Sequence, residues 1–165
     1  MSTLLVTRWG ARLGSRRMPC ALGRGGMTRD KHEGDGATPA GLWRVTGLLY
    51  RPDRLPASAV PPWARPISPR DLWSDDPADP AYNHATRAPH AFSHERLRRA
   101  DPLYDLVLTS DVNWPEAVPG KGSALFLHRW RKPRHPTAGC IAFAPADILW
   151  LAWAMPPGAK VFVRD

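Results

Sequence analysis

The chain has 165 residues, 43% of them hydrophobic, which is enough to bury the core of one domain and too apolar for a disordered chain. Its 19 prolines and 13 glycines argue against a helix bundle, and two cysteines exclude a disulfide scaffold. The net charge of +8 would suit a polyanionic partner, but the basic residues are scattered and form no helical stripe, so composition bias explains the charge equally well.

We expect a single domain over residues 1–165, because neither an internal repeat nor a linker divides the sequence. No stretch approaches the roughly 20 apolar residues that a transmembrane helix needs. The first residues, Met1 to Gly14, contain only a three-residue apolar run and lack the hydrophobic region of a signal peptide.

The first half of the chain predicts short strands joined by turns. The glycine-rich segment 20–26 lacks the spacing of a nucleotide-binding loop, so we interpret it as a turn between strands. The polar segment 30–41 is either a functional loop or an ordinary connection. The other elements expected here are a strand over 2–8, a turn region over 10–14 and a strand over 42–50 that breaks near Gly47.

The middle of the chain, residues 51–90, contains nine prolines, which exclude a continuous helix or a central strand. Its tryptophans and Tyr82 supply aromatic area to bury, which argues against disorder. We therefore expect a cleft wall or lid made of short elements.

The second half alternates between short apolar runs and turns. In the run from Ser123 to His128, we expect Ala124, Phe126 and His128 to share one face of a strand. The other elements expected here are a short helix over 93–99, a strand over 103–109, a turn over 111–120, an apolar run over 141–144, a helix over 145–155 and a strand over 159–163. The predicted fold class is mainly β, with a few short helices and one of them near the C-terminus.

The stretch from Gly122 to Phe143 presents one histidine and one cysteine at the ends of two apolar runs. His128 is suited to take the proton of the Cys140 thiol and to return it to a leaving amine. Gly139 permits an unusual turn, so the amides of Ala138, Gly139 and Cys140 are expected to converge on a developing oxyanion. A cysteine in an apolar run is also commonly an inert core residue.

Basic residues in the loop between them, Arg129, Arg131, Lys132 and Arg134, would favour a thiolate and attract a substrate carboxylate. A disulfide bond between Cys20 and Cys140 is possible from the sequence, but it would remove the free thiol that the proposed nucleophile needs.

Two other classes of function are weighed against catalysis. A metal site would draw on Cys140, His128, His135 and either His32 or Cys20, but their spacing matches no common zinc pattern. The positive charge and eight tryptophans would suit a nucleic-acid binder, which predicts steeply salt-dependent binding to single strands. We expect neither a metal or other cofactor nor a nucleic-acid partner.

The order His128, loop, Thr137-Ala138-Gly139-Cys140-Ile141 and short helix resembles the catalytic motif of the L,D-transpeptidase (YkuD-type) domain. Upstream, Lys31 to Gly41 and Val118 to His128 are similar to further segments of that family, as are the DLWSDDP and Tyr82-Asn83 elements. The resemblance covers most of the chain from about Cys20 onward and points to an uncharacterised branch.

The resemblance implies a β-sandwich-like catalytic domain acting on peptidoglycan stem peptides. Cys140 would attack the bond after diaminopimelate in a tetrapeptide stem and release D-alanine, with His128 as base and Gly139 at the oxyanion hole. The carbonyl of Arg129 would orient the imidazole, and the amide of Ala138 would help to bind the oxyanion. Residues expected to contact substrate are Thr137, Tyr82, Asn83, Arg131 and Arg134.

The acyl group would pass to an amine of another stem, giving a 3→3 crosslink, or to an amino acid or protein, which thereby becomes attached to the stem. Water as acceptor would make the chain an L,D-carboxypeptidase, and a catalytically quiet cell-wall-binding domain of the same fold is a further reading. We expect a monomer that carbapenem-type inhibitors acylate. The family implies the periplasm or cell envelope, whereas the lack of a visible signal peptide is equally compatible with the cytoplasm.

The sequence departs from the family at two positions beside the cysteine. Ala138 stands where the family often has histidine, and Ala142 stands where it often has an arginine two residues after the cysteine. The loop between His128 and Cys140 is also short for the family. We expect Arg129, Arg131 or Arg134 to replace the missing arginine in holding a substrate carboxylate.

Overall fold

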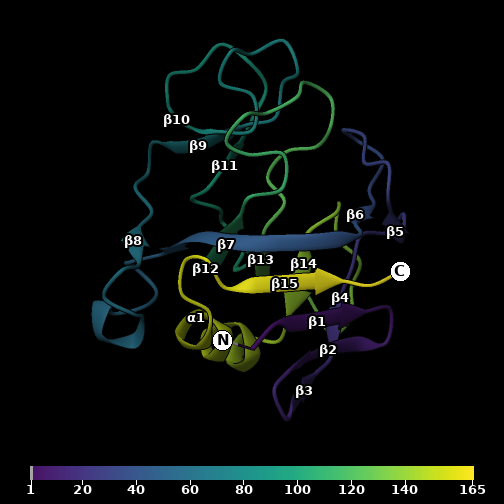
Figure 1. Cartoon of the computed structure of the whole chain (residues 1–165). Helices are drawn as coiled ribbons and strands as arrows, with labels where there is room; N and C mark the ends of the chain where they lie inside the picture. The colour runs from purple at the N-terminus through teal and green to yellow at the C-terminus, as the bar shows by residue number, and fades with distance from the viewer. Residues whose placement is uncertain (1) are drawn as a thin grey trace.

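The computed structural model describes residues 2–165, which form a mainly β fold with one α-helix near the C-terminus (Figure 1). The predicted fold class is therefore confirmed. The strands are β1 Leu4–Thr7, β2 Gly10–Leu13, β3 Arg16–Met18, β4 Cys20–Ala21, β5 Met27–Thr28, β6 Thr38–Pro39, β7 Gly41–Tyr50, β8 Arg65–Pro66, β9 Asp71–Ser74, β10 Ala85–Arg87, β11 His94–Arg96, β12 Leu106–Ser110, β13 Leu127–Arg129, β14 Ile141–Phe143 and β15 Lys160–Val163. The helices are the 3₁₀ turn η1 Ala57–Ala59 and α1 Pro145–Ala154.

Most strands belong to one large sheet with the order β3-β2-β1-β15-β7-β12-β13-β14-β4, and β8 pairs beside β7. The pairs β1–β15 and β13–β14 are parallel, whereas the other neighbours along this path are antiparallel. The sheet can be followed around β7 and β15 in Figure 1.

The long strand β7 joins the two halves of this sheet. Its first residues pair with β15 and its later residues pair with β12. The register to β12 shifts between Thr109 and Ser110, an irregularity that bends a strand and increases its twist. This shared strand lets the two halves face a common core.

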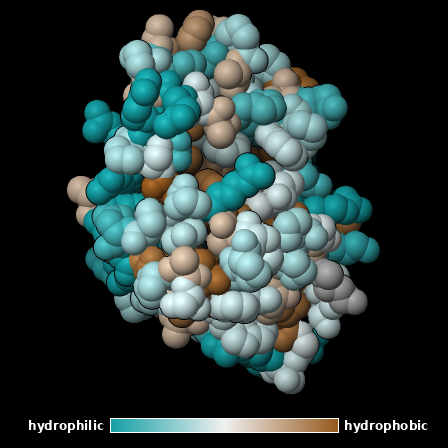
Figure 2. Space-filling model, turned by 90° about the vertical axis from the view of Figure 1, so that its left-hand side faces the viewer, coloured by the Kyte–Doolittle hydropathy of each residue, from teal (hydrophilic) through white to brown (hydrophobic). Residues whose placement is uncertain are grey.

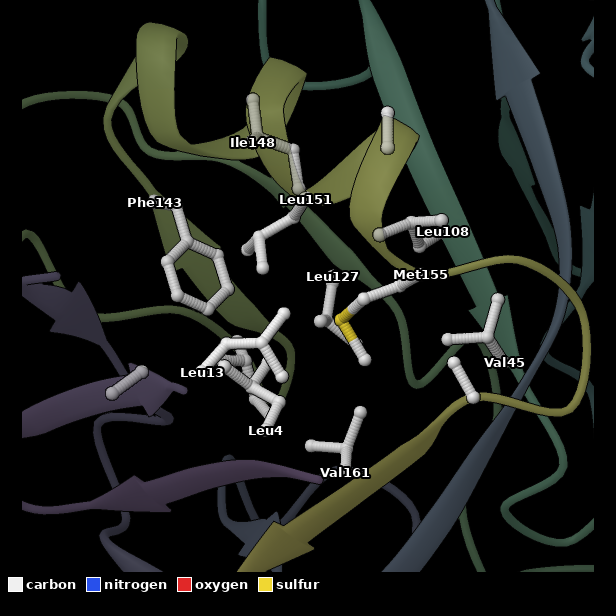
Figure 3. Close-up of a cluster of buried hydrophobic side chains, with 14 of the residues drawn as sticks. Leu4, Leu13, Val45, Leu108, Leu127, Phe143, Ile148, Leu151, Met155 and Val161 are labelled. Carbon is white, nitrogen blue, oxygen red and sulfur yellow. The ribbon is translucent and has the colours of Figure 1, made fainter. Parts of the chain in front are cut away.

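The main core lies between the sheet and α1 (Figure 3). Leu4 of β1, Leu108 of β12 and Leu127 of β13 are completely buried and point toward Leu151 of the helix. Pro145 occupies the first turn of α1, where its missing N–H costs no intrahelical bond, and Pro156 follows the helix end. The helix predicted over 145–155 is confirmed to within one residue.

A smaller layer covers the other end of β12 and β13, and it is seen at the top of Figure 1. The three-stranded sheet β10-β9-β11 forms its frame, so the proline-rich middle does fold into short elements. Trp73 of this sheet packs edge-on against Phe126 with ring centroids 4.9 Å apart. The same cluster contains Tyr104 and Cys140, so this layer extends to the predicted nucleophile.

Four boundaries or assignments differ from the sequence-based expectation. The helix predicted over 93–99 is wrong, because His94–Arg96 pairs with β9 as strand β11 and tertiary pairing overrides local helix signals. Residues 10–13 form β2 rather than a turn. The strand predicted over 103–109 begins at Leu106. The strand predicted over 123–128 begins only at Leu127, because Ala124 adopts a positive φ of 50°.

The face that bears β8 and η1 is mostly polar, with apolar atoms in small separate areas (Figure 2). Within residues 2–165, no helix has the length and apolar character needed to cross a membrane.

Shortening Leu151 should destabilise the fold more than the same change at an exposed leucine. Leu151 is fully buried against the sheet, so Leu151→Ala should lower the free energy of unfolding by about 2–5 kcal/mol. Leu42→Ala is the matched control, because Leu42 is 47% exposed on β7 and should cost less than about 1 kcal/mol. Urea denaturation followed by circular dichroism measures both, and equal losses would contradict the core assignment.

Candidate active site

The Cys140 thiol is buried at the start of β14 against the segment that leads into β13. Its Sγ donates a hydrogen bond to the Ala124 carbonyl at 3.1 Å and accepts one from the Phe126 N–H at 3.4 Å. Ile141 N–H then bonds to the Phe126 carbonyl and begins the parallel pairing of β14 with β13. The sulfur is thereby held at a fixed place relative to β13.

His128 lies on β13 with a buried side chain. Its Nδ1 is 2.6 Å from the carbonyl oxygen of Arg129, and a carbonyl can only accept. The hydrogen therefore resides on Nδ1, which leaves the lone pair of Nε2 to act as a base. The ring of Tyr104 packs edge-on at a centroid distance of 5.3 Å and restricts the imidazole from one side.

One cavity of about 370 Å³ brings the two predicted catalytic side chains together. Cys140 and His128 both line it, together with Thr137, Ala138 and Arg131 from the loop between them. Within residues 2–165, no hydrogen bond joins the sulfur to the imidazole. The two groups therefore share a cavity without forming a bonded pair.

Thr137 fixes the shape of the loop that carries the cysteine. Its Oγ1 donates to the Cys140 carbonyl at 2.6 Å and accepts from the Gly139 N–H at 3.0 Å. The Gly139 amide is therefore occupied, which corrects the expectation that three amides converge on an oxyanion. Across the described part of the chain, the N–H groups of Ala138 and Cys140 have no partner, so these two remain as candidate donors.

Only glycine fits at position 139. Its φ of +142° is one that L side chains rarely adopt, and a Cβ built there would lie 2.8 Å from the Ala37 carbonyl oxygen. The same Cβ would lie 3.4 Å from Nζ of Lys31. The nucleophile loop thus packs backbone against backbone on the polar loop of residues 30–37, with the ammonium of Lys31 beside it.

Burial keeps both candidate catalytic groups neutral near pH 7. Burial raises the pKa of the Cys140 thiol to about 12, and the nearby Glu95 carboxylate adds to this. Burial also lowers the pKa of His128 to about 4, against the opposing effect of its hydrogen bond to the Arg129 carbonyl. The resting site is therefore a thiol beside a neutral imidazole, not a thiolate beside an imidazolium.

Four residues that were predicted to contact substrate or to replace the missing arginine do not line the cavity. The Arg129 side chain turns to Asp105, at 3.9 Å, and only its carbonyl serves the site. Arg134 lies elsewhere on the surface, near the Trp9 carbonyl. Of the three arginines predicted to hold a carboxylate, only Arg131 lines the cavity.

Tyr82 and Asn83 do not line the cavity but bind residues of its wall, so their contact with substrate stays a prediction. The Tyr82 hydroxyl donates to Glu33 at 2.8 Å and accepts from the Gly122 N–H at 3.0 Å. Asn83 accepts from the Ala124 N–H at 2.9 Å, and its buried side chain braces the segment against which the thiol packs.

Several residues of the cavity were not among the predicted site residues, and most of them are charged. They are Arg24, Lys31, Glu33, Asp75, Glu95, Arg99 and Tyr104. Segment 30–41 was considered as a functional loop on its polarity, and this was the available signal for Lys31 and Glu33. Glu95 fell inside the helix wrongly predicted over 93–99, so its position beside Tyr104 could not be anticipated.

Trp130 occupies the space beside the alanine that follows the cysteine by two positions. It packs on Ala142 and Ala21 in a small buried cluster and also lines the cavity. The side chain at position 142 is completely buried, so this chain has an aromatic wall there.

Cys20 and Cys140 are both free and buried, so the bridge considered from the sequence is not formed. Burial raises the pKa of Cys20 to about 11, and Cys20 does not line the cavity that contains His128. In the described residues, no group of three or more His, Cys, Asp or Glu side chains is arranged to hold a metal ion.

Adding one methyl group at Gly139 should disturb the nucleophile loop. Gly139→Ala combines an unfavourable φ with a clash against the Ala37 carbonyl, so it should slow acylation of Cys140 by a β-lactam by about tenfold or more. Gly158→Ala is the control, because its φ is also positive at 90° but a Cβ there meets only open space. Intact-protein mass spectrometry gives both rates, and an unimpaired Gly139→Ala protein would contradict the packing argument.

Comparison with known proteins places the chain in a family. Residues 3–163 match the family model of the L,D-transpeptidase catalytic domain, YkuD. No protein with a curated description is matched by the sequence.

Among solved structures, an L,D-transpeptidase from Mycobacterium smegmatis is 12% identical with a TM-score of 0.44, covering 99% of this chain and 59% of its own. L,D-transpeptidase 3 from Mycobacterium tuberculosis is 12% identical with a TM-score of 0.49, covering 99% of this chain and 61% of its own. The chain thus spans about three fifths of the length of these structures. Because the family model matches nearly the whole sequence, the chain belongs to the family of L,D-transpeptidase (YkuD) catalytic domains.

Proposed function

We propose that this domain is a cysteine acyltransferase that acts on peptidoglycan tetrapeptide stems. Cys140 attacks the carbonyl of the third residue, diaminopimelate, and D-alanine leaves. The acyl group then passes from the sulfur to an amine of a second stem, giving a 3→3 crosslink. Water in place of the amine gives the L,D-carboxypeptidase reaction.

The acylation step moves one proton around the site. As the Cys140 sulfur forms its bond to the carbonyl carbon, its proton passes to Nε2 of His128. When the tetrahedral intermediate collapses, the carbon–nitrogen bond breaks and His128 returns that proton to the leaving amine. The unbonded N–H groups of Ala138 and Cys140 are the candidate donors to the oxyanion.

The observation that carries the proposal is the state of His128. Its Nδ1 hydrogen is held by the Arg129 carbonyl at 2.6 Å, and its ring shares a cavity with a free cysteine. Across the described residues Nε2 of His128 has no hydrogen-bond partner, so it is free to act as a base for the thiol that lines the same cavity. Membership of the L,D-transpeptidase family supplies the substrate class.

Replacing the nucleophile should abolish acylation. Cys140→Ala should give no covalent adduct with a carbapenem and release no D-alanine from a tetrapeptide stem. Cys20→Ala makes the same change at the other buried free thiol and should react like wild type. Intact-protein mass spectrometry reads the adduct, and a Cys140→Ala protein labelled as fast as wild type would overturn the proposal.

A second experiment distinguishes the transpeptidase from the carboxypeptidase and from a catalytically quiet binding domain. Muropeptides incubated with the wild-type protein should lose D-alanine and gain a crosslink. Loss of D-alanine without a crosslink favours the carboxypeptidase, and the absence of both changes favours the catalytically quiet domain.

The rate of acylation should hold in mild acid. His128 acts as a base only when neutral, and with a pKa of about 4 it stays neutral at pH 5.5. The rate should therefore change less than about twofold between pH 8 and pH 5.5 and fall as the pH drops through about 4, whereas an imidazole with a pKa near 6.5 would be about nine tenths protonated at pH 5.5. Carbapenem acylation followed across pH measures this, with circular dichroism to verify folding. A tenfold fall at pH 5.5 would contradict the assignment.

A further inference from the structure

The cavity beside Cys140 carries charges of both signs. Its acidic wall consists of Glu33, Asp75 and Glu95, which come from three separate segments of the chain. Lys31 lines the same cavity. The transfer chemistry does not require these charges, because Cys140 and His128 react as neutral groups.

The acidic wall has capacity to accept hydrogen bonds that the protein does not use. Oδ1 of Asp75 is buried and has no hydrogen-bond partner among the described residues. Glu95 accepts one hydrogen bond, from the Tyr104 hydroxyl to Oε2 at 2.6 Å. A buried carboxylate oxygen without a donor is costly, so this wall fits a ligand that brings N–H groups.

The three acids also repel one another. Burial raises the pKa of Glu95, and the neighbouring charges of Asp75 and Glu33 raise it further, against the Tyr104 hydrogen bond. Tyr82 and Ser123 hold Glu33 in place through hydrogen bonds to its Oε1 at 2.8 and 2.5 Å. An ammonium group placed between these carboxylates would relieve the repulsion.

Lys31 supplies the opposite charge at a fixed place. Its side chain is only 9% exposed, and an ion pair with Asp35 holds its ammonium. Its stem passes so close to Gly122 that a Cβ there would lie 2.9 Å from Cγ of Lys31. Two further N–H bonds of the Lys31 ammonium remain for a ligand, because it has three donors.

The positive and negative groups of the cavity wall lie next to each other. Lys31 and Glu33 are two residues apart on one loop, and the pair Gly122-Ser123 contacts both, the glycine beside Lys31 and the serine bonded to Glu33. Adjacent sites for an ammonium and a carboxylate match a ligand that carries both groups on one carbon atom, which is the free end of an amino acid.

We propose that Lys31 and the acidic wall form a subsite for the zwitterionic end of the acyl donor's third residue, with Lys31 on its carboxylate and Asp75 and Glu95 on its ammonium. This rests on the proposed function, because that function puts a diaminopimelate side chain in the cavity. The subsite selects donors with both charges over donors that have lost either one.

Equilibrium binding to the Cys140→Ala protein tests the subsite without any chemistry. Three tetrapeptide stems differ only at the third residue: meso-diaminopimelate has both charges, 2-aminopimelate lacks the ammonium and lysine lacks the carboxylate. By isothermal titration calorimetry, the diaminopimelate peptide should bind about tenfold or more tightly than either of the others.

Two substitutions in that background should separate the charges. Asp75→Asn should reduce the preference for the diaminopimelate peptide over the 2-aminopimelate peptide to about threefold or less, and leave its preference over the lysine peptide unchanged. Lys31→Met should reduce the preference over the lysine peptide and leave the preference over the 2-aminopimelate peptide unchanged. Asp30→Asn is the matched control for Asp75→Asn, because it removes the same negative charge at a residue that lies next to Lys31 but outside the cavity, and both preferences should persist.

Three results would overturn the subsite: equal binding of the three peptides, no binding of any, or a parallel loss of both preferences in each variant. Failure of the proposed function gives a different result. A wild-type protein whose Cys140→Ala form discriminates as described, yet which releases no D-alanine, refutes the reaction and leaves the subsite standing.

Discussion

The site depends on a close approach of backbones that only glycine permits. Gly139 lies against the Ala37 carbonyl, and on the other side Thr137 exchanges backbone hydrogen bonds with Leu22 and Arg24 of the glycine-rich segment. Three loops distant in sequence therefore meet without side chains between them. This contact fixes the cysteine relative to the polar loop and brings the ammonium of Lys31 beside it.

This dense packing determines which groups of the site carry a charge. Because Cys140 and His128 are both removed from water, neither carries its charge at neutral pH, and the charged groups stand around them in the cavity wall. In the proposed reaction, the thiol would lose its proton only as a bound carbonyl accepts the electron pair of the sulfur. A resting thiol of this kind is also protected from oxidation and from adventitious alkylation, since both need the thiolate.

Local signals in the sequence predicted most of the elements and identified Cys140 and His128 as candidate catalytic residues. The proline at the start of α1, the alternation around His128 and the Gly139-Cys140 turn each report on their own neighbourhood. Local signals did not predict the acidic wall, because Asp75 directly follows β9 and Glu95 lies on β11, and the pairing of these two strands brings both residues to the cavity. The same pairing turned the expected helix at 93–99 into a strand, so one long-range contact accounts for both failures.

The place of β15 in the sheet has a consequence for the order of folding. The last strand of the chain lies between β1 and β7, so the hairpins formed by the first three strands connect to the rest of the sheet only through it. Because β1 pairs with a strand about 155 residues away in the sequence, we expect this part of the sheet to form late in folding. Until β15 pairs with it, β1 is an edge strand, and Arg8 and Arg12 near its end place positive charge where pairing with another chain would begin.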